Sequence, residues 1–428
     1  MKRDHSRTKG LASAKVVRLF PYKRPQSFES HFSMGCSLRD RGMVDEAIKE
    51  WSRAAALDRN DPEVRVCLGM ALAEKGQYTG AVNYFRAALE LDPQDAEIYF
   101  YLGMAHFQNN EVHDAIRAWV RSLTLDPFDL EVRLSLAEAY AEQGKNKKAL
   151  IQIEKILKID PHHLEGINLQ GIIYLNAGHT DLAMECLRKV IATDPHFSGA
   201  HMNLGVVYMH MGMLDPGISE FRKCVRLEPY NPDAHYNLGH ALFHRGLDDQ
   251  ALDSLHTAIK LAPNFTDAHL FVSWIHRECS SYDEALATLC RILEYDRENP
   301  EALCAMGHVL FLQENLESAL EHFRKAILGD DRNPDAHYGL GLCLSAKRDF
   351  TGAGKALNRA VKLAPQYGEP YFHLAILYRD TGKTEKAIST LKRLLEICPG
   401  HKEGTEVLNT LVSPLDNTFG EGRAGDSI

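Results

Sequence analysis

A strict period of 34 residues constrains this 428-residue chain more than any other feature of its sequence. From Phe28 to His401 the period runs without an insertion or deletion and gives eleven units of equal length. Such units bury their apolar faces against their neighbours, so the chain need not divide into the two or three domains that its length alone suggests. The period therefore predicts an array.

Each unit has the pattern of two amphipathic helices. In residues 232–265, apolar side chains recur at helical spacing on either side of Gly246, where the first helix should stop. Pro263 follows the last turn of the second helix. One helix pair buries too little surface to fold alone, so it needs the pairs before and after it.

Small and large residues recur at fixed places in every unit. The middle of the first helix carries a small residue: Gly35, Gly69, Gly103, Ala137, Gly171, Gly205, Gly239, Ser273, Gly307, Gly341 and Ala375. Sixteen positions later stands a large apolar one: Trp51, Phe85, Trp119, Ile153, Leu187, Phe221, Leu255, Leu289, Phe323, Leu357 and Leu391. We interpret the small residues as points of close helix approach and the large ones as the filling between units.

This pattern resembles the tetratricopeptide repeat, a 34-residue helix–turn–helix unit. The resemblance implies an all-α, right-handed α-solenoid, or superhelix, of antiparallel helix pairs. Asn110, Ser280, Glu314 and Arg348 replace the usual turn glycine, and we expect those turns to be slightly less tight. The predicted repeats are 28–61, 62–95, 96–129, 130–163, 164–197, 198–231, 232–265, 266–299, 300–333, 334–367 and 368–401.

The segments outside the array differ from it in charge and pattern. Residues 1–27 carry eight Lys or Arg against one Asp, and we predict a flexible basic arm that is either a solvated tail or a contact for an anionic surface. Residues 402–412 have an apolar side and predict a capping helix. Residues 413–428 are polar and glycine-rich and are expected to be a disordered tail.

The family resemblance implies that the first helices of the repeats line a concave groove that binds partners. Its recurrent contact positions here are apolar or aromatic over many repeats, and such a surface favours a protein or peptide ligand with apolar anchors. Packing between helices is the competing role for several of these side chains. The predicted groove residues are Phe100, Met104, Phe107, Met202, Asn203, Val206, Met209, Tyr236, Asn237, His240, Phe243, Trp274, Phe311 and Tyr338.

Two subtypes of the family give narrower comparisons. Asn203 and Asn237 share the sixth position of successive repeats, which is similar to the asparagine ladder of O-linked N-acetylglucosamine transferases. The alternative is that asparagine is simply common there. The chaperone-binding subtype places Lys and Asn at the fifth and ninth positions, where this chain has Phe32 and Cys36, so binding of heat-shock chaperone tails is disfavoured.

The sequence shows no arrangement of catalytic side chains. No nucleophile–base set, phosphate-binding loop or paired carboxylates interrupt the repeats, so we predict a protein that is not an enzyme and needs no cofactor. His240 and His244 lie four apart with His210 one repeat earlier, but no further ligand completes a tetrahedral metal site, so no metal is predicted. His201, His235, His269 and His337 share the fourth position and are expected to pack.

Charge and cysteine usage restrict partners and compartment. The net charge is −9 although the first 27 residues contribute +7, and an acidic body argues against nucleic acid. Nine scattered cysteines without a CxxC pair indicate reduced thiols in the cytoplasm. No apolar run is long enough to span a bilayer, and we expect no secretory signal at the basic start.

We therefore predict a non-catalytic scaffold that holds a partner peptide or helix in its groove and assembles a multiprotein complex. The alternative is the recognition subunit of a glycosyltransferase or similar enzyme whose catalytic chain is separate. Self-association through the groove stays open.

Overall fold

The computed structural model describes residues 26–412, which contain 23 α-helices and no strand. They fall into two compact units, one ending at Met213 and the other starting at Leu214, and each is described by itself. The predicted all-α fold of successive helix pairs is confirmed. The predicted basic arm lies outside the described residues except for Gln26 and Ser27, which begin the first helix, and the predicted tail 413–428 lies outside them entirely.

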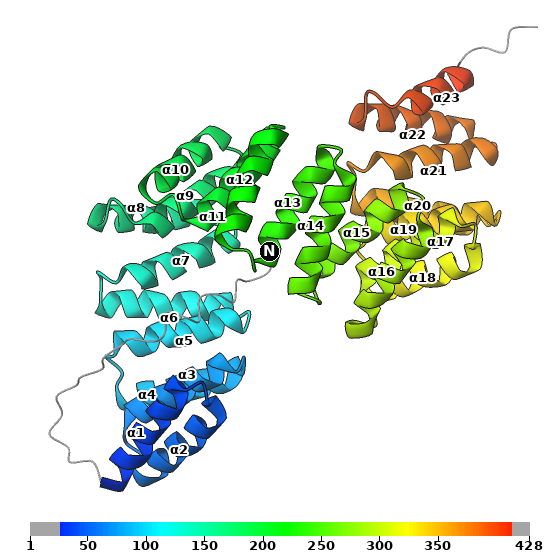
Figure 1. The fold of residues 1–428 in the computed structure, drawn as a ribbon. Coiled ribbons are helices and arrows are strands. Elements are labelled where there is room, and N and C mark those ends of the chain that lie inside the picture. The colour runs from blue at the N-terminus through cyan, green and yellow to red at the C-terminus, as the bar shows by residue number, and fades with distance from the viewer. Residues whose placement is uncertain (1–25, 413–428) are drawn as a thin grey trace, which may run out of the picture. The chain divides into compact units, whose positions relative to one another are not determined.

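Unit 1 is a stack of helix pairs in chain order, shown from blue to green in Figure 1. The described part of this unit contains α1 (Gln26–Asp40), α2 (Val44–Leu57), α3 (Pro62–Glu74), α4 (Tyr78–Leu91), α5 (Ala96–Gln108), α6 (Val112–Leu125), α7 (Leu130–Glu142), α8 (Asn146–Ile159), α9 (Leu164–Asn176), α10 (Thr180–Thr193) and α11 (Ser198–His210). The odd-numbered helices begin repeats and are called A helices below; their even-numbered partners are called B helices.

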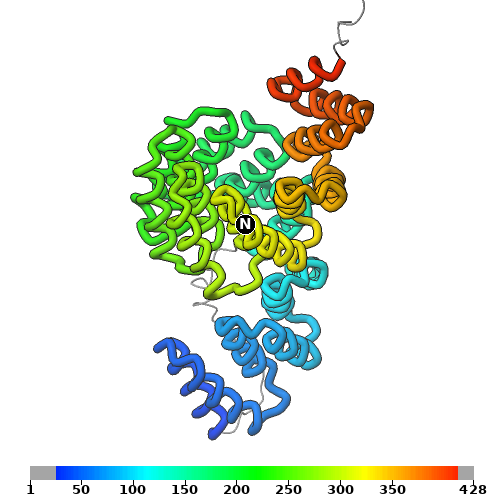
Figure 2. The backbone as a smooth tube through the Cα atoms, turned by 90° about the vertical axis from the view of Figure 1, so that its right-hand side faces the viewer, coloured from blue at the N-terminus to red at the C-terminus, as the bar shows by residue number. Residues whose placement is uncertain are grey.

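Unit 2 continues the same alternation, and its hairpins can be followed from green to red in Figure 2. Its described part contains α12 (Leu214–Leu227), α13 (Pro232–His244), α14 (Asp248–Leu261), α15 (Thr266–Glu278), α16 (Tyr282–Tyr295), α17 (Pro300–Leu312), α18 (Leu316–Gly329), α19 (Pro334–Ala346), α20 (Phe350–Leu363), α21 (Gly368–Asp380), α22 (Thr384–Ile397) and α23 (Lys402–Val412). Val407, Leu408 and Leu411 of α23 pack on Leu391 and Leu394 of α22.

The predicted small-to-large contact holds the two helices of a pair together. A Cβ added at Gly239 would lie 2.7 Å from Leu255 Cγ and 3.0 Å from the carbonyl oxygen of Ala251. Only a residue without a side chain allows this approach. The large apolar residue at the position of Leu255 is at most 1% exposed in all eleven repeats, which confirms its predicted role in packing.

The turn from A helix to B helix keeps one geometry whether or not glycine is present. Gly246 has φ +78°, and the four substitutes Asn110, Ser280, Glu314 and Arg348 have φ between 58° and 63°. The turn at Arg348 has backbone hydrogen bonds of 2.9 Å, like those of 2.8 and 3.0 Å around Gly246. The expectation of looser turns is therefore wrong, because the side chains adopt the left-handed conformation and the turn keeps its shape.

In seven repeats, the side chain of the fourth residue donates a hydrogen bond to a backbone carbonyl of the preceding inter-repeat turn. Nε2 of His269 lies 2.9 Å from the carbonyl oxygen of Pro263, six residues earlier. Because a carbonyl can only accept, Nε2 must carry the proton. The same bond to the sixth preceding carbonyl is made by Arg65, Arg133, His201, His235, His337 and Tyr371. The predicted packing histidines are therefore also hydrogen-bond donors.

Within the described residues, no helix has the length and apolar content needed to cross a membrane.

Candidate partner-binding surface

Five ring-bearing side chains form one cluster on two neighbouring A helices of unit 2. Tyr236, His240 and Phe243 come from α13, and Phe271 and Trp274 come from α15. The rings of Phe271 and Trp274 are stacked with centroids 5.6 Å apart, and Phe243 meets Trp274 edge-on at 4.9 Å. His240 lies 5.1 Å from Phe271. We call these five residues the aromatic surface.

Helical spacing explains why these side chains meet. Tyr236, His240 and Phe243 follow one another at intervals of four and three residues, which places them on one face of α13. The rings of Tyr236, Phe243, Phe271 and Trp274 pack against a buried cluster that includes Leu255 and Val272. All five rings of the aromatic surface remain partly exposed. Both roles considered from the sequence, packing and surface, are therefore filled by the same residues.

Phe271 lies at the centre of the aromatic surface, and the sequence prediction omitted it. It contacts Tyr236 at 6.3 Å, Phe243 at 5.6 Å, and both His240 and Trp274. A signal was present, because Phe271 occupies the sixth position, the same position as Asn237 one repeat earlier. Treating that position only as part of an asparagine ladder hid the ring.

His240 of this surface forms a hydrogen bond with the neighbouring His244. Nε2 of His240 and Nε2 of His244 are 3.3 Å apart, so one ring donates to the other when both are neutral. Burial lowers the pKa of His240, and a charge on His244 lowers it further. Among residues 26–412, no group of three metal-ligating side chains includes either histidine.

The two predicted asparagines differ in their hydrogen bonding. The amide nitrogen of Asn203 donates to the side-chain oxygen of Asn168 at 3.0 Å, a partner that the sequence prediction did not include. The side chain of Asn237 makes no hydrogen bond among residues 26–412 and is partly exposed. Its amide can therefore bind the backbone of an extended ligand beside the aromatic surface.

The predicted residues of unit 1 are more engaged in packing. Phe100 is only 9% exposed, and its carbonyl accepts the indole N–H of Trp119 at 3.2 Å. Phe107 packs on Trp119 with ring centroids 5.5 Å apart, and Met104 Sδ lies 4.0 Å from Ser135 Oγ. Met202, Val206 and Met209 are partly exposed on α11.

In the described part of unit 2, Tyr338 and Phe311 make no ring contact with the aromatic surface. Tyr338 belongs to a second ring cluster, with Tyr367 and His373 each 5.6 Å away and His308 at 6.4 Å. Phe311 packs against the buried cluster around Phe323. The structure thus divides the predicted residues of unit 2 into two clusters and one packing residue.

A second polar group, missed from the sequence, lies at the turn between α5 and α6. One ligand-type atom each from His106, Glu111 and Asp114 lies within 4.8 Å of the others. His106 Nδ1 is 2.5 Å from Glu111 Oε2, and Asp114 is ion-paired with Arg117. Glu111 is thus paired with His106 across the turn, and Asp114 with Arg117.

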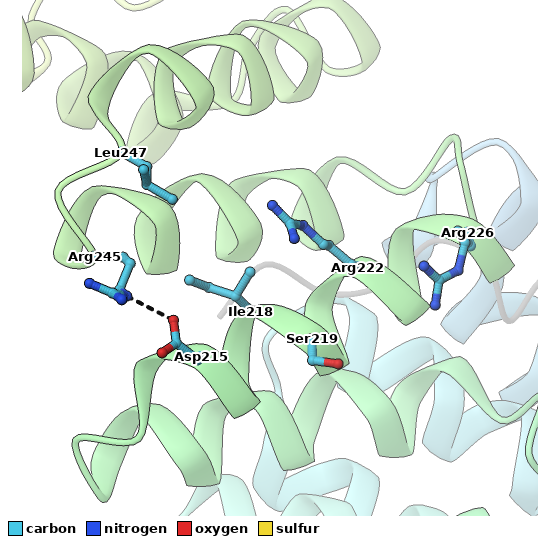
Figure 3. A pocket seen from close by; sticks show the side chains of 7 residues that line it. All are labelled: Asp215, Ile218, Ser219, Arg222, Arg226, Arg245 and Leu247. Atoms are coloured by element: carbon cyan, nitrogen blue, oxygen red, sulfur yellow. Dashed lines mark hydrogen bonds and ion pairs between the residues drawn. The ribbon is translucent and has the colours of Figure 1, made fainter.

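A basic hollow of about 500 Å³ lies on the B-helix side of unit 2 (Figure 3). Arg222 and Arg226 stand one turn apart on α12, next to Ile218, and Arg245 is held by Asp215 at 2.7 Å. Arg226 has no ion-pair partner within the described residues. Arg222 and Arg226 could contact an anionic group. Neither arginine was predicted as a contact residue from the sequence.

Stacked helix hairpins, seven of which have a close contact between a glycine of the A helix and a large side chain of the B helix, define the class of this molecule, an all-α helical-repeat protein. Family models described as tetratricopeptide repeat match residues 32–163, 164–231, 232–265, 274–368 and 344–403, and one model alone covers more than half of the chain. The chain belongs to the tetratricopeptide repeat family.

Three curated relatives match short stretches of the chain. The probable UDP-N-acetylglucosamine–peptide N-acetylglucosaminyltransferase SPINDLY of Eustoma exaltatum subsp. russellianum is 30% identical over 90 residues, 21% of this chain and 10% of the relative. Superkiller protein 3 of Schizosaccharomyces pombe is 30% identical over 93 residues, which are 22% of this chain and 7% of the relative. The BBSome complex member BBS4 homolog of Drosophila melanogaster is 23% identical over 147 residues, which are 34% of this chain and 30% of the relative. The chain therefore spans a tenth or less of the first two relatives.

Two solved structures match over most of the chain. The APC/C hetero-tetramer Cut9–Hcn1 has a TM-score of 0.50 at 15% identity and covers 90% of this chain and 97% of that one. Yeast Tom70 has a TM-score of 0.50 at 16% identity, and the match covers 91% of this chain and 96% of the Tom70 chain. At these identities the likeness shows the fold alone, a tetratricopeptide-repeat α-solenoid.

Proposed function

We propose that this chain is a non-catalytic scaffold that binds a segment of a partner protein on the aromatic surface of α13 and α15. The observation that carries the proposal is the partial exposure of five clustered rings on adjacent A helices. Clustered aromatic side chains supply large contact area with few rotatable bonds, which is typical of binding hot spots.

The ligand that fits this surface has apolar anchors and an exposed backbone. Rings of Phe243 and Trp274 offer apolar contact, and the free amide of Asn237 offers one donor and one acceptor to a peptide bond. Met202, Val206 and Met209 provide a separate apolar contact area on α11 of unit 1. The remaining predicted residues are proposed as supporting contacts.

Paired variants of the full-length chain test the proposal. Phe243→Ala with Trp274→Glu should reduce recovery of co-purified partners by at least about tenfold, because truncating a hot-spot ring costs about 2 kcal/mol. The matched control is Tyr230→Ala, since Tyr230 is an aromatic residue of the same unit that is 84% exposed outside this surface. Quantitative mass spectrometry measures recovery, and circular dichroism checks the helices. Full recovery with the double variant would contradict the proposal.

The second candidate is the recognition subunit of a glycosyltransferase complex. The local match to a probable N-acetylglucosaminyltransferase favours it, as does Asn203 beside Asn168 on neighbouring A helices. A transferase chain recovered in equal amount with this protein would select it over the scaffold. We also propose a cytoplasmic location, supported by nine cysteines that are all free.

A further inference from the structure

Two histidines of α13 direct the same ring nitrogen toward one another. Nε2 of His240 lies 3.3 Å from Nε2 of His244. They are the only two of the 21 histidines in the sequence that stand four residues apart. That spacing puts both side chains on one face of the helix, one turn apart. The spacing alone did not show in which direction the two rings point.

Neighbouring aromatic rings restrict the orientation of both imidazoles. The His240 ring packs against Phe271 with centroids 5.1 Å apart and lies 6.4 Å from the ring of Tyr236. The His244 ring lies 4.5 Å from that of His240 and meets Phe243 edge-on at 6.0 Å. His240 is partly buried, whereas His244 is exposed. One nitrogen is therefore held in place while the pair stays open to solvent.

The separation of the two nitrogens matches that of two ligands on one tetrahedral metal ion. Imidazole nitrogens bind Zn²⁺ at about 2.0 to 2.1 Å, and two such ligands at the tetrahedral angle are about 3.3 to 3.4 Å apart. The observed 3.3 Å is slightly longer than the usual range of hydrogen bonds donated by N–H groups, about 2.7 to 3.2 Å. The pair can therefore accept such an ion without a change in the distance between its nitrogens.

The two histidines supply two ligands and leave the other coordination positions open. No metal was predicted here from the sequence because no further ligand completes a tetrahedral site. In the described part of the chain, the pair is not joined by a third metal-ligating side chain, so two positions of a tetrahedral ion are left for water. Imidazole ligands favour Zn²⁺, Cu²⁺ and Ni²⁺ over Mg²⁺ and Ca²⁺, and of these ions Zn²⁺ has the tetrahedral geometry that the spacing matches.

We propose that His240 and His244 form a two-imidazole chelate for Zn²⁺, which the aromatic surface shares through His240. Each neutral ring contributes the lone pair of Nε2 and keeps its remaining proton on Nδ1. Two bonds to the ion replace the hydrogen bond between the rings, and two waters complete the coordination. This site goes beyond the partner binding proposed above, because the ion binds to this chain alone.

Carbethoxylation mapped by mass spectrometry tests the chelate in the full-length protein. Accessible thiols are first blocked with N-ethylmaleimide so that they cannot bind the ion, and the protein is then treated with diethyl pyrocarbonate at pH 7. We expect about 0.5 mM Zn²⁺ to slow modification of His244 about tenfold, which is the protection that mass action gives for a Kd of about 50 µM. His235, in the same tryptic peptide 227–245, and exposed His162 should be modified at unchanged rates. The same concentration of Mg²⁺ should not protect His244.

One variant and a matched control assign the ligands. His240→Gln keeps a donor and an acceptor beside His244 but removes one ligand, so Zn²⁺ should no longer protect His244. His162→Gln, at an exposed site outside the pair, should keep the full protection. Circular dichroism checks that both variants keep their helices. An unprotected His244 in the parent chain, or equal protection of His244 in the parent chain and in His240→Gln, would overturn the proposal.

Discussion

Four residues without glycine's freedom adopt the left-handed backbone at the A-to-B turn. Arg348 has φ +63° and an exposed side chain that carries no ion pair within the described residues. The left-handed region costs a residue with a Cβ about 1 kcal/mol relative to glycine. The array tolerates this cost because the packing on both sides of the turn determines its shape.

Replacing Arg348 with glycine should therefore stabilise the protein by about 1 kcal/mol, because it removes the backbone strain and no side-chain contact. Chemical denaturation followed by circular dichroism measures the change. Asn110→Gly is the matched control and should gain less, since asparagine tolerates this conformation better than arginine. An unchanged or lower midpoint in Arg348→Gly would show that the turn stores no strain.

His308 is a neutral histidine inside unit 2. Burial lowers its pKa to about 4; the carboxylate of Asp335 acts to raise it and the charge of Arg277 to lower it. Its ring packs edge-on against Phe323 at 4.9 Å. Burial likewise lowers the pKa values of His240, His276 and His373. All four side chains therefore resist protonation in the folded state.

Acidification should destabilise unit 2. In the unfolded chain His308 takes up a proton near pH 6.5, whereas in the folded chain it does so only near pH 4. The stability that is present above pH 6.5 is therefore lost as the pH falls from 6.5 to about 4. At pH 5 the loss amounts to about 2 kcal/mol from this residue. Denaturation of His308→Gln at pH 7.5 and pH 5 should show a correspondingly smaller pH dependence. His162→Gln, at an exposed site, should keep the full dependence.

Seven A helices have a side-chain cap at their N-terminus, whereas most B helices have none. Asp61, Asp95, Asp129, Asn231, Asn299 and Asn333 each accept a backbone N–H of the first turn, and His163 does so through Nδ1. The helices α11, α15 and α21 begin after an aromatic residue without such a bond. Starts of A helices therefore differ in local stability.

Loss of one cap should loosen one helix start. Asn299 Oδ1 accepts the N–H of Ala302 at 2.9 Å, and Asn299→Ala should cost about 1 kcal/mol. Hydrogen exchange should speed up in the first turn of α17 and stay unchanged in α19. Asn299→Asp keeps the acceptor and should exchange like the parent chain; equal acceleration in both variants would contradict a capping role.

The helices could be predicted from the sequence far better than the surface could. The strict period fixes which residues are small and which are large, and Gly239 against Leu255 needs no more than that pattern. The aromatic surface depends on which half-buried rings meet across repeats, and periodicity carries no such information. Phe271 and the Asn203–Asn168 bond were therefore missed, and the pattern could not tell that Phe100, one of the predicted groove residues, is only 9% exposed.

Within each unit, stability is transmitted between neighbours. Contacts run between the two helices of a pair and between successive pairs, as in α3 with α4 and α4 with α5. In such arrays stability is close to a sum of repeat terms and neighbour interfaces. A defect in one repeat should therefore weaken the repeats beside it more than distant ones.

Phe85 and Phe323 form a matched pair for testing this locality. They occupy the same repeat position in the two units, are at most 1% exposed, and face Gly69 and Gly307 at the same distance. Phe85→Ala should cost about 3 to 5 kcal/mol and speed hydrogen exchange in α3 to α6, while leaving α17 to α20 unchanged. Phe323→Ala should give the converse pattern. Phe128→Ala, at a site 75% exposed, should change neither region. Loss of protection across both units from one substitution would instead indicate that the chain unfolds as a whole.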